Sequence, residues 1–142
     1  MSASPVRARR SLFGALLTVA IVALTASTAY IHSTLGGMLF TLNAIGYSLL
    51  AVAIVVGAAA TWPIVVRFSW LPRIGLFGFA LATILGWIVM GPYYDLAYIA
   101  KGIEVTLLAL LVIDSFRVYG GPAGLVTEAV ASLQETVAGI RR

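Results

Sequence analysis

Lys101 and Glu104 are two charged residues inside a long apolar run, residues 96–113 (LAYIAKGIEVTLLALLVI). Ionisable side chains deep in a membrane segment are costly, and they usually pair with each other or belong to a functional site. Three residues apart on a helix, the two side chains share a face and can form an ion pair. Two hypotheses follow: a neutralised structural pair, or a site at which Glu104 carries a proton or binds a cation.

Asn43 and Tyr47 are polar residues on a second apolar run and are expected at a similar depth. Asn43 follows Thr34 by nine residues, as Glu104 follows Asp95, and nine residues of helix span about 13 Å. Tyr47 lies one turn further along the same face. The candidate ligand or ion site therefore combines residues from two helices: Asn43, Tyr47, Tyr98, Lys101 and Glu104.

His32 is the chain's one histidine, and it is expected at the rim above these residues. Imidazole titrates near neutral pH, so His32 is a candidate pH sensor as well as a hydrogen-bonded interfacial residue. A metal site built from His32 with Asp95 or Glu104 has little support, and we predict neither a metal nor another cofactor. The absence of cysteine excludes disulfides, thiolate metal sites and cysteine nucleophiles.

The composition is that of a membrane protein. Of 142 residues, 61% are hydrophobic and 10% are charged, against about 25% charged in soluble domains. About 20 apolar helical residues cross a bilayer, and lipid requires backbone hydrogen bonds to be closed within the segment. With short connections between neighbours, the sequence predicts an all-α, antiparallel up-down transmembrane bundle with four spans: 12–31, 35–61, 74–90 and 96–113.

Arginines predict the orientation of the spans. They precede the first span, occupy the 62–73 loop and follow the fourth, whereas the other two connections contain no Lys or Arg. The positive-inside rule places both termini and this loop in the cytoplasm. The net charge of +4 therefore suggests lipid headgroups rather than nucleic acid. A signal peptide cleaved near residues 27–29 is the alternative, and it would leave three spans.

Residues outside the spans form two further segments, a basic N-terminus (1–11) and a cytoplasmic tail (115–142) beside the 12–114 membrane domain. The tail shows an apolar helical stripe over residues 123–140, which packs on a membrane-protein partner, on its own bundle or on the membrane surface. We expect Ser33 or Thr34 to cap the second helix and Asp95 the fourth. Asp114 and Arg117 form an interfacial pair.

Small residues on the second and third spans predict close helix packing, either inside the bundle or in a homo-oligomer. They are Gly46, Ala53, Gly57, Gly75, Gly78, Ala82 and Gly86.

Three strings resemble those of small uncharacterised bacterial four-span membrane proteins: residues 32–37 (HSTLGG), 39–47 (LFTLNAIGY) and 101–105 (KGIEV). The resemblance implies the four-span fold and a bacterial cytoplasmic membrane, and it gives no information on activity. The small multidrug-resistance transporters are similar in having four short helices and one membrane glutamate. Their glutamate lies in the first helix, whereas Glu104 lies in the fourth, and their dual-topology members lack the strong arginine bias of this chain.

Three functions are therefore open. The first is a structural, accessory or interaction role that involves no catalysis. The second is a small transporter or proton-coupled carrier that uses Glu104, with a small-molecule ligand that the sequence does not identify. The third is a membrane enzyme or redox subunit, for which no set of acid–base or cofactor-binding residues converges.

Overall fold

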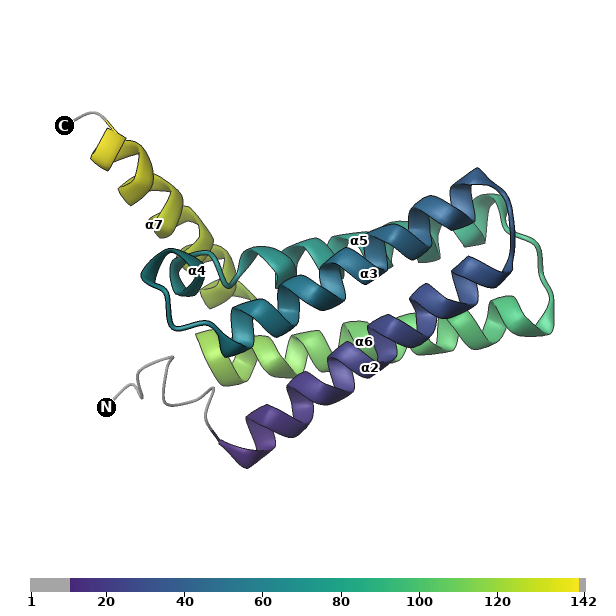
Figure 1. Ribbon diagram of the computed structural model, residues 1–142, viewed down its shortest axis with the longest axis horizontal. Coiled ribbons are helices and arrows are strands. Elements are labelled where there is room, and N and C mark those ends of the chain that lie inside the picture. The colour runs from purple at the N-terminus through teal and green to yellow at the C-terminus, as the bar shows by residue number, and fades with distance from the viewer. Residues whose placement is uncertain (1–10, 141–142) are drawn as a thin grey trace.

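The computed structural model describes residues 11–140, all in helices and short connections. Figure 1 shows four long helices that run side by side and two further helices at one end. Each of the four long helices has the length and the apolar composition needed to cross a membrane. The elements are α2 (Leu12–Thr34), α3 (Met38–Ala59), α4 (Pro63–Arg67), α5 (Leu71–Met90), α6 (Asp95–Tyr119) and α7 (Pro122–Ile140). Residues 1–10, with most of the predicted basic N-terminus, and Arg141–Arg142 lie outside the described residues.

The long helices form an antiparallel bundle in which each packs on two others. Helix α2 packs on α3 and α6, and α5 packs on the same two helices from the other side. The connections 35–37 and 91–94 share one end of the bundle, here called the turn end. Helix α4 and the start of α7 lie at the opposite end, here called the α4 end.

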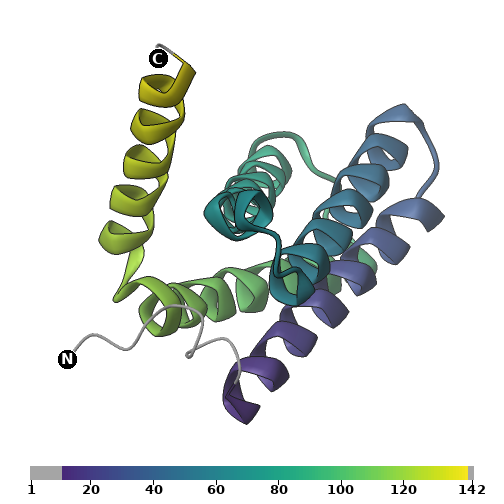
Figure 2. The same ribbon diagram turned by 60° about the vertical axis from the view of Figure 1, so that its left-hand side comes forward.

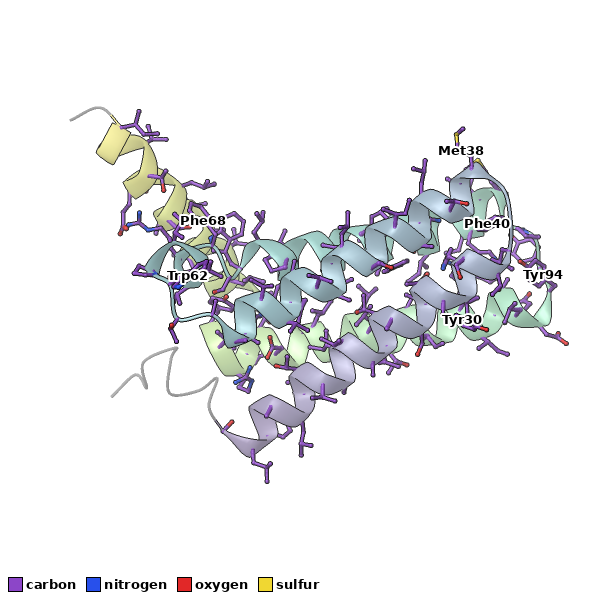
Figure 3. The ribbon with its side chains drawn as sticks, viewed as in Figure 1. Tyr30, Met38, Phe40, Trp62, Phe68 and Tyr94 are labelled. Atoms are coloured by element: carbon purple, nitrogen blue, oxygen red, sulfur yellow. The ribbon has the colours of Figure 1, made fainter. Side chains whose placement is uncertain are left out.

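The core of the bundle is apolar, and so is its outside. The core includes residues from all four long helices that are at most 5% exposed: Ile21, Ile54, Leu76, Leu107 and Leu111. Large apolar side chains also cover the outer surface, which suits hydrocarbon and not water. In Figure 3, Trp62 and Phe68 lie at the α4 end and Tyr30 and Tyr94 at the turn end, as aromatic belts do at the two membrane interfaces.

The start of α3 corrects one prediction. Ser33 and Thr34 do not cap this helix, because both belong to the last turn of α2 and donate their hydroxyls to carbonyls three residues back. Gly36 and Gly37 then take φ values of 70° and 86°, a left-handed conformation that glycine adopts without strain. Helix α3 therefore begins at Met38, three residues later than predicted.

The ends of α6 also differ from the prediction. The N-cap residue is Tyr94, and Asp95 is the first helical residue and makes no capping bond. Its negative charge still suits the first turn of the helix. The helix runs to Tyr119, six residues past the predicted span, because it stays regular until Gly120 adopts φ 77°. Gly121 N–H then donates to the carbonyl of Ser115, as in a Schellman end.

Helix α7 packs on the α4 end with one face and leaves another open. Trp70 Nε1 donates to Ser132 Oγ at 2.7 Å, and Arg67 pairs with Glu135 at 2.5 Å. Figure 2 shows the rest of α7 running away from the side of the bundle. The predicted apolar stripe divides between the two faces: Ala129 is buried, whereas Val126, Val130, Leu133, Val137 and Ile140 are exposed on the open face.

Two of the predicted small residues allow close contact between α3 and α5. A Cβ at Gly46 would lie 2.5 Å from Cζ of Phe79, and one at Gly75 would lie 3.2 Å from Cδ2 of Leu50. Gly57 faces Ser69 and Pro72 at 3.9 Å, and Ala53 borders the same region. A Cβ at Gly78 or Gly86 would meet no atom within 4 Å, and Ala82 is exposed.

Candidate functional site

Glu104 is fully buried in the turn-end half of the bundle, where three helices supply its hydrogen bonds. Lys101 Nζ on α6 lies 2.6 Å from Oε2, and Thr83 Oγ1 on α5 lies 2.9 Å from the same oxygen. Thr28 Oγ1 on α2 donates to Oε1 at 3.2 Å. Tyr47 Oη on α3 lies 2.8 Å from Thr83 Oγ1, so Tyr47 donates when Thr83 donates to the carboxylate. With His32, described next, these six residues are the Glu104 network.

His32 is part of this network and not of the rim alone. Its side chain is 4% exposed, and its Nδ1 lies 2.8 Å from the carbonyl oxygen of Thr28. A carbonyl can only accept, so Nδ1 carries the proton. Nε2 then faces Oε1 of Glu104 at 3.8 Å. The imidazole also packs against the rings of Tyr47 and Phe40, with centroids 5.6 and 6.1 Å away.

Two of the residues predicted for the site are not part of the Glu104 network. Tyr98 is 55% exposed and packs edge-on against Trp87, with ring centroids 5.2 Å apart. Each three-residue step falls about 60° short of a full helical turn, so the stripe that links Tyr98 through Lys101 to Glu104 drifts around α6. Asn43 is half-buried on α3, and its amide makes no side-chain hydrogen bond within residues 11–140.

Sequence reasoning missed Thr28 and Thr83. Each is a hydroxyl in an apolar helix at the level of Glu104, where interhelical hydrogen bonds to hydroxyls are common. That signal is weak, because a threonine can equally bond within its own helix. Thr25 is just as buried as Thr28, but it donates to the carbonyl of Ile21 at 2.7 Å.

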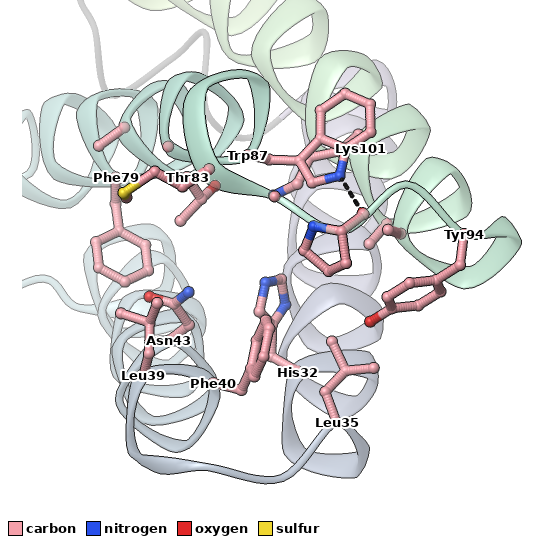
Figure 4. Close-up of a pocket in the computed structure, with 17 residues that line it drawn as sticks. His32, Leu35, Leu39, Phe40, Asn43, Phe79, Thr83, Trp87, Tyr94 and Lys101 are labelled. Atoms are coloured by element: carbon pink, nitrogen blue, oxygen red, sulfur yellow. Dashed lines mark hydrogen bonds between the residues drawn. The ribbon is translucent and has the colours of Figure 1, made fainter.

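A partly open cavity of about 400 Å³ lies on the turn-end side of the network. Lys101, Thr83 and His32 reach both the network and the cavity, so they form its polar floor. The volume falls within the range of small-molecule sites, about 300–1,000 Å³. The walls come mainly from α3, α5, and α6 with the residue before it. Figure 4 labels Leu39, Phe40, Asn43, Phe79, Trp87 and Tyr94 among the wall residues. Ala82, Gly86, Ala97 and Ala100 also line the cavity.

A second buried polar cluster lies at the α4 end. Arg73 Nε donates to Asp114 Oδ2 at 2.7 Å, and Arg73 Nη1 donates to the carbonyl of Ser69 at 2.6 Å. The expected contact between Asp114 and Arg117 is present at 2.6 Å. Arg73 is one of the loop arginines from which only the orientation of the spans was predicted. In the structure it is 4% exposed, and its guanidinium lies over the Tyr119 ring. The buried apolar core occupies the levels between the two clusters.

The charged and polar groups of the site can form ion pairs and hydrogen bonds. Residues 11–140 contain no group of three or more His, Asp or Glu side chains that could hold a metal ion. Comparison of the chain with protein-family models, with curated proteins and with solved structures found no match.

Proposed function

We propose that this small multipass membrane protein binds a small molecule in the cavity above the Glu104 network. One observation carries the proposal: three members of a buried polar network form the floor of a mainly apolar cavity of ligand size. Ligand sites commonly combine apolar walls with a few convergent polar groups. A purely structural ion pair needs no such cavity beside it.

The proposed orientation makes this cavity open to the outside of the cell. Arg67, Arg73 and Arg117 all lie at the α4 end, which the positive-inside rule assigns to the cytoplasm of a bacterial cell. The turn end is then external. Between the cavity and the cytoplasm lie the apolar core and the Arg73–Asp114 pair. This arrangement matches the outward-facing state of a small carrier in which Glu104 exchanges a proton.

Gly86 offers a direct test, because it borders the cavity and a Cβ there meets no atom within 4 Å. Gly86→Leu should fill the cavity without disturbing the bundle. Gly78→Leu is the matched control, since it has equal space on the same helix but does not line the cavity. Native mass spectrometry from mild detergent should find a bound small molecule in the wild type and in Gly78→Leu, but not in Gly86→Leu. Equal retention by both variants, or no bound molecule in any of the three, would overturn the proposal.

A structural, accessory or interaction role is the second candidate, and the open face of α7 favours it. Leu133 and Val137 are half-exposed there, beside a packed face that contains Ala129 and Ser132. A second copy of this chain or another membrane protein would cover that apolar stripe. The same mass spectra test the role: Leu133→Glu should dissociate the assembly, whereas Glu128→Gln on another face of α7 should not. A monomer without a protein partner in the wild type would argue against this role.

A further inference from the structure

The charge of the cavity floor identifies a class of ligand. We infer, on the basis of the proposed cavity function, that the ligand is an uncharged, flat, mainly apolar molecule with a hydrogen-bond acceptor such as a ring carbonyl. Quinones are one group with this chemistry. The inference depends on the balance of charge in the floor, on the direction of its dipole, on its free donors and on the shape of the walls.

The floor, taken together with Glu104 behind it, is neutral as a whole. Glu104 contributes one negative charge and Lys101 one positive charge at 2.6 Å, and His32 is uncharged when Nδ1 alone carries a proton. Moving an ion from water into an apolar cavity is costly unless an opposite charge awaits it. Here each charge already has its partner. A neutral ligand avoids that cost, whereas either kind of ion would leave the cavity with a net charge.

The ion pair is a dipole whose positive end faces the cavity. Lys101 borders the cavity, and Glu104, with no exposed surface, lies behind it. An incoming cation would therefore meet the ammonium first. An anion would meet an ammonium whose charge is already balanced, because the Glu104 carboxylate lies one hydrogen bond behind it. The partial negative charge of a carbonyl oxygen suits the positive end of this dipole without adding a net charge.

Free donors are available for such an oxygen. An ammonium has three N–H groups, and Lys101 donates to Glu104 as its one acceptor within residues 11–140. Two N–H groups therefore remain for a ligand or water. Figure 4 shows the Asn43 amide on the α3 wall, across the cavity from Lys101. Its NH₂ group can donate to a second acceptor on the far side of a ring.

The walls suit a flat ring. Four aromatic rings border the cavity: Phe40 from α3, Phe79 and Trp87 from α5, and Tyr94 from the connection before α6. Aromatic rings bury large apolar areas and stack or pack edge-on with other rings. Trp87 Nε1 donates to the carbonyl of Pro92 at 3.0 Å, which holds the indole in place beside the cavity. A sugar or another strongly hydrated molecule would lose hydrogen bonds on these walls.

Three naphthalene-sized probes that differ in charge test this inference. They are menadione (neutral), 2-naphthoate (anionic) and trimethyl(2-naphthylmethyl)ammonium (cationic). Binding is measured on the full-length protein in lipid nanodiscs at about pH 8, where an ordinary imidazole is neutral. Subtraction of the signal from Gly86→Leu nanodiscs removes partitioning into lipid. Menadione should bind at least about tenfold more tightly than either ion, because each ion must be desolvated without a free counter-charge.

Two variants should then reverse the preference. Glu104→Gln leaves Lys101 without its counter-charge, so naphthoate should gain at least about tenfold in affinity relative to menadione. Lys101→Met leaves Glu104 alone, so the ammonium probe should gain instead. Tyr98→Phe, on the exposed side of α6, is the control and should leave the order unchanged. If Glu104→Gln or Lys101→Met fails to fold, the relative affinities of the wild type for the three probes still decide whether the ligand class is neutral.

The outcomes separate this inference from the proposed function. If an ion binds the wild type as tightly as menadione does, and Gly86→Leu abolishes that binding, the neutral class is wrong and the cavity function stands. If no probe binds above the Gly86→Leu signal, but a co-purified molecule does, the ring class is wrong and the cavity function again stands. If neither a probe nor a co-purified molecule binds, both proposals are overturned.

Discussion

Asp114→Asn should be among the most destabilising conservative changes in this chain. The Asp114 carboxylate is 2% exposed and accepts from Arg73 at 2.7 Å and from Arg117 at 2.6 Å. Asparagine keeps the shape of the side chain but removes its charge. Arg73, with 4% of its side chain exposed, would then lie in the bundle without a counter-charge.

The expected cost follows from the burial of the pair. Removing one partner of a buried ion pair costs about 3–5 kcal/mol, because the other charge stays desolvated. Arg73 would keep its hydrogen bond to the Ser69 carbonyl and its contact with the Tyr119 ring, so we expect a loss of about 3 kcal/mol. The Arg67–Glu135 pair is the internal reference, with side chains 40% and 65% exposed. Glu135→Gln should cost at most about 1 kcal/mol.

Unfolding by sodium dodecyl sulfate in mixed micelles, followed by far-UV circular dichroism, measures these losses. Arg73→Met and the double variant complete a mutant cycle with Asp114→Asn. Because the double variant leaves no unpaired Arg73, it should lose at least about 2 kcal/mol less than the sum of the two single changes. Strictly additive losses, or an Asp114→Asn variant no weaker than Glu135→Gln, would refute the idea that this pair joins α5 to α6.

Two further predictions use other features of the chain. Gly120→Ala should lose about 1–2 kcal/mol in the same unfolding assay, because φ is 77° there. Gly102→Ala, with open space and helical backbone in α6, should gain up to about 1 kcal/mol, and equal effects of the two changes would contradict this account. Tyr93→Cys supplies the one thiol in a cysteine-free chain and should react with a membrane-impermeant maleimide added outside intact cells. Reaction only in inverted vesicles would reverse the proposed orientation.

Sequence alone predicted the features that depend on local chemistry. Four apolar runs of sufficient length have few alternatives to membrane-spanning helices, because lipid leaves no other partner for the backbone. The structure contains four such helices in an all-helical chain over the described residues. The contact between Lys101 and Glu104 is equally local, since residues three apart on one helix are neighbours wherever that helix packs.

Features that depend on helix packing could not be predicted in this way. Thr28 and Thr83 meet Glu104 because of how α2 and α5 rotate against α6, and nothing in their own neighbourhoods indicates it. Arg73 looked like an ordinary loop arginine, but α5 begins two residues before it and turns it inward to Asp114. Tyr98 was included in the candidate site because it lies three residues before Lys101, but at that position the side chain on α6 faces out of the bundle.

Helices α5 and α6 share two polar contacts with matched spacing. Thr83 and Arg73 are ten residues apart on α5, and their partners Glu104 and Asp114 are ten residues apart on α6. Sliding either helix along the other would break both contacts at once, so the pair should move as one rigid unit. Helix α3 has no charged residue and is tied to this unit at the cavity level by the Tyr47 hydroxyl. A change in the shape of the cavity should therefore come from movement of α3 against this unit, at the contact where Phe79 packs over Gly46.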